Sequence, residues 1–264
     1  MGSATREALA ASRTALAALG SQADLATGEQ LLAAGRVIGD SSALRSALVD
    51  RSVDNSEKVA VVNAVFAGLG DSTKSLLGSV ASVQWSSEDD LLAGIEELGY
   101  RVLAASTTGE STIESELFAF GAAVSSDPEL ELAVSSKLGS AAAKSALVST
   151  LLSGKASAQT LAIVQHLVQQ PRGRRIAALL SHAASIVADV AGLAVATVTT
   201  ATAIAPAQLE RLATALASSY GRALTINHVI DPSVLGGLRV QLGDEVIDGT
   251  VATRLDDLRL QLAS

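Results

Sequence analysis

The sequence has no cysteine and very few aromatic residues. Without cysteine, the chain can form neither disulfide bonds nor thiolate metal sites. Aromatic residues make up 2% of the chain and apolar residues 48%, so a core has to be built from Ala, Leu, Val and Ile. Such a core suits closely packed helices better than a β-sandwich, in which aromatic and β-branched residues are enriched.

Basic charge and long apolar runs are also scarce. The net charge is −8 and the isoelectric point is near 4.9, and no basic stripe with interleaved aromatic residues occurs, which argues against nucleic-acid binding. The most apolar segment, 176–205, is interrupted by His182 and Asp189 and changes its periodicity partway, so we expect no direct membrane insertion. Residues 1–20 lack the apolar centre of a signal peptide.

Helical periodicity dominates up to about residue 190. Leucines 9, 16 and 19 predict an amphipathic helix over 5–19, and the pair Asp127–Pro128 is typical of a helix start. The segments "LLAAGRVIGDSSALRSAL" and "LFAFGAAVSSDPELELAV" resemble each other at an offset of about 86 residues. The matching pairs are Leu31/Leu117, Ala33/Ala119, Gly35/Gly121, Leu44/Leu130, Ala47/Ala133, Lys58/Lys144, Ala60/Ala146, Val62/Val148 and Gly68/Gly154.

This internal repetition predicts two helical bundles in tandem, divided in the Thr/Gly/Ser-rich segment 106–112. From Gly192 the period becomes strand-like, and the pattern predicts a strand, a helix opened by Pro206, a strand over 223–230, a hairpin with a turn at Gly243–Asp244, and a last helix capped by Thr250. The expected fold is therefore multidomain, with helical bundles at 1–107 and 108–191 and a small α+β domain at 192–264.

The residues that could form a phosphate or metal site have simpler structural explanations. Gly236–Gly237 precedes a strand and does not open a helix, so it fits a close backbone approach better than a phosphate cradle. Asp244 and Asp248 lack the spacing of a calcium loop and fit turn and cap roles.

The histidines and the basic loop also receive structural interpretations. His166, His182 and His228 form no ligand pair. The arginines of "QPRGRRIAALL" fit a solvated loop, with a contact to an acidic partner as the alternative. We therefore expect no metal, no cofactor and no catalytic group.

The C-terminal segment "IDPSVLGGLRVQLGDEVIDGTVATRLDDL" resembles the signature of the delta subunits of F-type ATP synthases, the family of the oligomycin-sensitivity-conferring protein. The residues that carry this resemblance are Asp231, Gly236, Gly237, Gly243, Asp244, Asp248, Gly249, Thr250, Arg254, Leu255 and Leu258. Upstream, "SSALRSALVDRSVDNSEKVAVVNAVFAGL" is similar to the helical domain of the family in weaker form. A second helical copy is a departure from the ordinary family pattern and resembles the enlarged actinobacterial type.

The resemblance implies a stator subunit without chemistry of its own. Its partners would be the N-terminal helices of the alpha subunits in the catalytic head and the b subunit of the stalk, on the cytoplasmic face of the bacterial plasma membrane, without self-association. The family's alpha contact involves the first and fifth helices, which correspond here to 5–19 and about 72–84. Leu9, Leu16, Leu76 and Val80 either line that groove or fill the core. The alternative function is a free-standing helical adaptor or chaperone-like binding protein.

Overall fold

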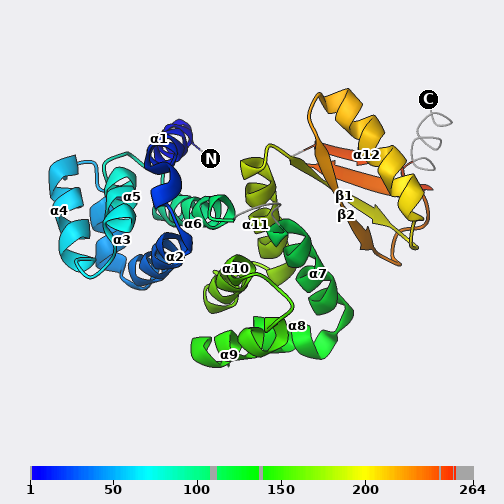
Figure 1. The fold of residues 1–264 in the computed structure, drawn as a ribbon, viewed down its shortest axis with the longest axis horizontal. Helices are drawn as coiled ribbons and strands as arrows, with labels where there is room; N and C mark the ends of the chain where they lie inside the picture. Colours follow the sequence, from blue (N-terminus) through cyan, green and yellow to red (C-terminus); the bar gives the residue numbers. More distant parts are fainter. Residues whose placement is uncertain (1, 108–111, 137–138, 244, 252, 254–264) are drawn as a thin grey trace, which may run out of the picture. The chain divides into compact units, whose positions relative to one another are not determined.

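The chain folds into two compact units, residues 1–187 and 188–264. The computed structural model describes residues 2–107, 112–136, 139–243, 245–251 and 253. The first unit is helical and the second combines a sheet with a helix, which confirms the predicted fold class (Figure 1). The finer division into domains at 1–107, 108–191 and 192–264 stays a prediction.

The first copy of the helical repeat comprises α1 to α6. These helices are α1 (Ser3–Leu19), α2 (Leu25–Asp40), α3 (Ser42–Val49), α4 (Asn55–Val65), α5 (Asp71–Ala81) and α6 (Glu88–Ala105), with a 3-10 turn at Gly20–Gln22. Asp24, Ser41 and Ser87 cap α2, α3 and α6 by accepting backbone hydrogen bonds. The core is aliphatic apart from Phe66 and Trp85, and the indole of Trp85 is buried and donates to the carbonyl of Val80 at 2.9 Å.

The second copy repeats this order from α2 onward. It comprises α7 (Ile113–Ser126), α8 (Pro128–Ser135), α9 (Ala141–Leu152), α10 (Ala158–Gln169) and α11 (Ile176–Val190). Asp127 accepts hydrogen bonds from two backbone amides at the start of α8, as the Asp–Pro pair predicts. Helices α7 to α11 follow α2 to α6 at the offset of about 86 residues seen in the sequence.

Equivalent positions of the repeat are buried alike. Leu31 and Leu117 are both fully buried, and so are Val62 and Val148. The paired lysines 58 and 144 are also both buried, which is unusual for this residue type. The repeat therefore extends to the environment of individual side chains.

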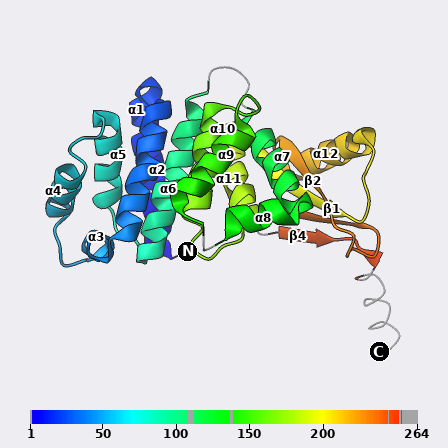
Figure 2. The same ribbon diagram turned by 90° about the horizontal axis from the view of Figure 1, so that it is seen from below.

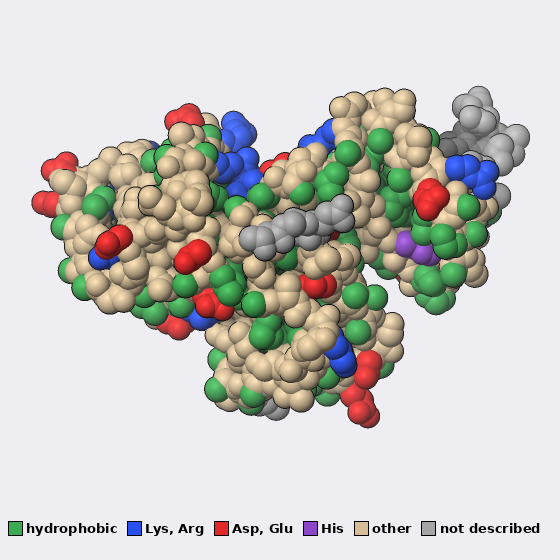
Figure 3. All heavy atoms as spheres, viewed as in Figure 1, with side chains coloured by type: hydrophobic (Ala, Val, Ile, Leu, Met, Phe, Trp, Pro, Cys, Tyr) green, Lys and Arg blue, Asp and Glu red, His purple; other side chains and the backbone are tan. Residues whose placement is uncertain are grey.

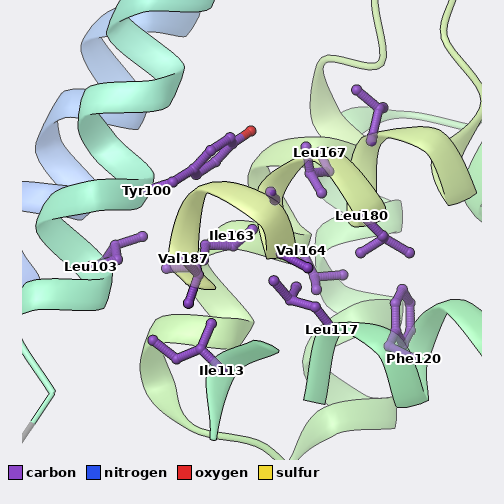
Figure 4. Close-up of a cluster of buried hydrophobic side chains, with 14 of the residues drawn as sticks. Tyr100, Leu103, Ile113, Leu117, Phe120, Ile163, Val164, Leu167, Leu180 and Val187 are labelled. Carbon is purple, nitrogen blue, oxygen red and sulfur yellow. The ribbon is translucent and has the colours of Figure 1, made fainter. Parts of the chain in front are cut away.

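Helix α6 joins the two copies because its residues enter two hydrophobic cores. Leu91, Ile95 and Leu98 belong to the core of the first copy, whereas Tyr100 and Leu103 belong to the core of the second. Figure 4 shows Tyr100 and Leu103 on the α6 side of a cluster formed with residues of α7, α10 and α11. In Figure 2, α6 runs between the helices of the first copy and α10.

The second unit contains a four-stranded sheet in the order β2-β1-β3-β4. Its elements are β1 (Ala194–Thr200), α12 (Pro206–Tyr220), β2 (Leu224–Ile230), β3 (Leu238–Leu242) and β4 (Glu245–Asp248). Strands β1 and β2 are parallel and joined by α12, while β3 is antiparallel to both β1 and β4. The core lies between α12 and the sheet face that carries Ala196, Val198 and Val240. Only residues 251 and 253 of the predicted last helix are described.

Candidate binding surfaces

The family-like glycines hold the start of β3 against the segment that follows β4. Gly236 and Gly237 have φ angles of 99° and 81°, a region that disfavours side chains. A Cβ at Gly237 would stand 2.5 Å from the carbonyl oxygen of Gly249, and the amide of Gly249 donates to the carbonyl of Leu238 at 2.9 Å. The glycine pair therefore permits a close approach of two backbones, as the sequence indicates.

The aspartates of the same region shape turns. Asp231 accepts the amide of Ser233 at 2.9 Å, and Asp248 accepts the amide of Thr250 at 3.0 Å. Hydrogen bonds from the side chain and amide of Ser233 lower the pKa of Asp231, and those from the amide and side chain of Thr250 lower the pKa of Asp248. Gly243 has a φ of 59° at the turn between β3 and β4. Asp244, Arg254, Leu255 and Leu258 lie outside the described residues.

A cavity of about 650 Å³ opens beside the glycine pair within the second unit. Its lining combines apolar and polar side chains, and Arg211 is its charged member. The residues that line it are Thr200, Ala201, Thr202, Ile204, Gln208, Arg211, Leu212, Gly236, Gly237 and Leu238. The family-like motif thus builds one wall of this hollow.

Replacing Gly237 with alanine is expected to destabilise the second unit more than replacing Gly221. Both glycines have positive φ, but no atom lies within 4 Å of a Cβ at Gly221. The left-handed conformation costs about 1–2 kcal/mol at either site, and the collision with Gly249 adds about 1–3 kcal/mol at Gly237. Hydrogen exchange of the β1 and β3 amides measures the difference. Equal losses for the two variants would contradict the role assigned to Gly237.

The predicted groove residues divide between core and surface. Leu76 and Val80 are fully buried in the core, and Leu9 is 8% exposed, whereas Leu16 is half-buried. On α1, Ala4, Ala11, Ala15 and Ala18 share one side of the helix. The opposite side carries Arg13, which pairs with Glu97 of α6, so the alanine side turns away from α6.

These alanines offer a partner helix a smooth surface next to α5, which packs on α1. On the face seen in Figure 3, uncharged atoms cover most of the surface, with acidic and basic side chains scattered among them. The role of Leu9, Leu16, Leu76 and Val80 in a groove stays a prediction.

A buried polar cluster lies where the two helical copies meet. Glu96 of α6 is 6% exposed and His166 of α10 is 1% exposed. The imidazole Nε2 donates to Glu96 Oε1 at 3.1 Å, because its Nδ1 accepts from the guanidinium of Arg36 on α2, also at 3.1 Å. Glu96 Oε2 accepts from Arg172 and, at 3.3 Å, from Arg174. Four segments of the first unit are thereby tied together.

This arrangement fixes the protonation states of the cluster. Burial lowers the pKa of His166, the hydrogen bond to Glu96 opposes this, and Arg36 and Arg172 lower it further. Burial alone would raise the pKa of Glu96, but His166 and the two loop arginines reverse this and leave it lowered. At neutral pH the cluster therefore contains a neutral imidazole and an ionised carboxylate.

The helical unit is expected to lose stability on acidification. Both groups bind fewer protons in the folded than in the unfolded chain, so stability falls as pH drops below about 6.5 through His166 and below about 4.5 through Glu96. Urea unfolding at pH 7.0 and 5.5, followed by the fluorescence of the single tryptophan, measures the slope. In His166→Gln the slope should shrink, while His182, present in both proteins, cancels from the comparison. An unchanged slope would show that His166 is not the sensor.

The loop arginines correct one expectation. Sequence patterns favour a solvated loop for "QPRGRR", but Arg172 and Arg174 turn inward to Glu96, and Arg172 adopts a φ of 45°. The sequence does contain a signal for this contact. Glu96 lies on a side of α6 that is otherwise formed by Leu92, Gly99 and Leu103, and a charged residue in such a place indicates a buried partner. His228 is half-buried, and its Nε2 lies 2.7 Å from Thr200 Oγ1.

Within the described residues, no three His, Asp or Glu side chains come close enough together to hold a metal ion. None of the described helices has the length and apolar character needed to cross a bilayer. The fold and its surfaces define a tandem helical repeat joined to a small α+β unit that carries a glycine- and aspartate-rich turn motif.

Comparisons with known proteins give this class a family. The sequence profile described as "ATP synthase delta (OSCP) subunit" matches residues 102–262, more than half of the chain. ATP synthase subunit delta of Leifsonia xyli subsp. xyli is 56% identical over 263 residues, and both chains are fully covered. The Streptomyces griseus subunit delta is 38% identical over 270 residues, again with full coverage of both.

The chain belongs to the ATP synthase delta (OSCP) subunit family. A chain in the mitochondrial ATP synthase hexamer of Toxoplasma gondii is similar to it at 20% identity with a TM-score of 0.42, covering 64% of this chain and 95% of that one. The enlarged length is shared with the actinobacterial relatives, so the resemblance identified in the sequence is confirmed.

Proposed function

We propose that this chain is a non-catalytic stator subunit that links the catalytic head of an F-type ATP synthase to its peripheral stalk. It would hold the N-terminal helices of the alpha subunits with its helical unit and the b subunit with its α+β unit. It would act on the cytoplasmic face of the bacterial plasma membrane as a peripheral member of the complex. Its work is mechanical, because it keeps the head stationary while proton flow turns the rotor.

The observation that supports this proposal is the presence of two units with separate cores on one chain. The helical unit has two hydrophobic cores joined by α6, and the second unit has a small core of its own between α12 and the sheet. A linker needs two such bodies, each able to hold a different partner. Resistance to torque requires slow dissociation, which comes from a large desolvated contact and not from exposed ion pairs.

The alpha contact is assigned to the alanine side of α1 and the adjacent α5. Ala11 and Ala18 are exposed there, and an amphipathic helix can lay its apolar side against such a surface at close range. We propose that Leu16, which lies on another side of α1 and packs on the core, contributes to this contact only by holding α1 in place. Leu9, Leu76 and Val80 would support it from the core beneath.

Paired substitutions on α1 test the assignment. In Ala11→Glu/Ala18→Glu, two charges would be trapped against the partner helix, so a tagged chain should no longer recover alpha and beta subunits from detergent-solubilised membranes but should still recover b. Ala10→Glu/Ala17→Glu is the matched control, because these alanines are also exposed but lie on another side of α1. If both variants still recover the head, the assignment is refuted. If the wild-type chain recovers neither the head nor the b subunit, the free-standing adaptor is favoured.

A further inference from the structure

Among the residues that the structure describes, the second helical copy has no counterpart of α1 of its own, and the first copy supplies this cover. In the first copy, α1 packs against α5 and α6. The helix that corresponds to α5 by the repeat is α10, and the helices of the first copy that pack against α10 are α2 and α6. Leu32 of α2 and Tyr100 and Leu103 of α6 are buried in the core of the second copy.

The contact between α2 and α6 at this junction is close. A Cβ at Gly28 would stand 2.6 Å from side-chain carbons of Leu103, and one at Gly99 would stand 2.6 Å from Leu32. Each glycine therefore makes room for a leucine of the other helix, which is how small residues let helix axes approach. These two leucines are the ones that continue into the second core, so α2 and α6 enter it as a single packed pair.

Polar contacts hold α2 in place along its length. Arg36 bonds His166, which bonds the buried Glu96. Farther along, Gln170 Nε2 donates to Asp40 Oδ1 at 3.0 Å. If α2 left this junction, apolar residues would become exposed and the ionised Glu96 would keep fewer partners. Both changes are strongly unfavourable.

The space that remains between α2 and α10 is small and polar. It is a hollow of about 330 Å³ lined by Glu29, Gln30, Leu32, Ala33, Arg36, Ala162, Gln165 and Gln169. A helix with its side chains is about 10 Å across and cannot enter a hollow of this size beside α2. The second copy therefore has no room for an added helix at the place where α1 and α5 meet in the first.

We propose that α2 and α6 permanently occupy the helix-binding position of the second copy, so that each chain accepts one partner helix, on α1 and α5, and not two. This inference rests on the proposed function for the identity of the partner. The sequence of α2 indicates what a partner helix should present to α1 and α5. It should carry apolar residues seven positions apart, like Leu25 and Leu32, with a small residue such as Gly28 between them.

The cysteine-free chain allows the junction to be locked and tested. Ala33 and Gln169 line the same hollow from α2 and α10 and are half-buried, so Ala33→Cys/Gln169→Cys can be bridged with a short bis-maleimide. The probe is a synthetic peptide of the N-terminal segment of the alpha subunit from the same synthase, titrated by calorimetry into wild-type and bridged full-length chains. The expected result is one peptide per chain in both, with affinities within about threefold. Two peptides per wild-type chain, or loss of binding on bridging, would overturn the proposal.

Hydrogen exchange of the free wild-type chain separates this inference from the proposed function. If α2 covers α10, the amides of α10 should exchange at least about a hundredfold more slowly than those of the half-exposed α9. If the peptide binds nowhere, the proposed head contact fails, while slow exchange at α10 still supports the occupied junction. Exchange of α10 as fast as that of α9 overturns the occupied junction whatever the peptide does.

Discussion

Replacing Glu96 with glutamine is expected to lower the free energy of unfolding of the helical unit by about 2–4 kcal/mol. Removing one member of a buried ion pair costs about 3–5 kcal/mol, because the remaining charges lose their compensation. The side chains of Arg172 and Arg174 are 22% and 39% exposed, so water relieves part of this cost. A glutamine amide would also direct donor hydrogens at groups that are themselves donors.

Urea unfolding at pH 7, followed by the fluorescence of Trp85, measures this loss. The matched control is Glu88→Gln, which removes a carboxylate that pairs with Arg45 near the surface, where its side chain is 39% exposed. That change should cost much less than Glu96→Gln, because exposed ion pairs contribute little to stability. Equal effects at the two positions would mean that the junction between the helical copies does not depend on the buried carboxylate.

Replacing Gly94 with alanine is expected to destabilise the same unit by about 1–3 kcal/mol, the usual range for overpacking a filled core. A Cβ at Gly94 would stand 2.1 Å from the indole of Trp85. The indole is rigid, 1% exposed and held by its hydrogen bond to Val80, so it cannot move aside without opening the core. This collision outweighs the higher helix propensity of alanine.

The control for this prediction is Gly78→Ala, also within a helix. A Cβ there would meet Val59 at an ordinary 3.7 Å, so the substitution should be neutral or stabilising by up to about 1 kcal/mol. Thermal unfolding is followed by circular dichroism, because Gly94→Ala would itself alter the fluorescence of Trp85. If the midpoint of Gly94→Ala does not fall below that of the wild type, the packing of Trp85 against α6 is wrong.

Local patterns were sufficient to predict the helices and the C-terminal strands. In the alternating sequence of β1, Ala196 and Val198 share one side of the strand, and in the structure that side belongs to the core beneath α12. Pro128 and Pro206 begin helices where the fixed backbone of proline suits the first turn. These features depend on neighbours within a few residues.

The junction between the helical copies could not be predicted in the same way. Glu96 meets His166 and Arg172, which are 70 or more residues away, and no local pattern encodes such a distance. The close contact of Gly28 with Leu103 is equally non-local, and a glycine inside a helix has several meanings in sequence. The apolar stripe that contains Leu76 and Val80 indicates that these side chains are buried. It does not say whether they are buried by the chain's own core or by a partner helix.

Proton-driven ATP synthesis in membrane vesicles tests the stator role most directly. Vesicles whose synthase has been assembled without this chain should make no ATP from an imposed proton gradient, because the head would turn with the rotor, and adding the purified full-length chain should restore synthesis. The chain with Ala11→Glu/Ala18→Glu should fail to restore it, whereas Ala10→Glu/Ala17→Glu should succeed. Undiminished synthesis in vesicles that lack the chain would contradict the account.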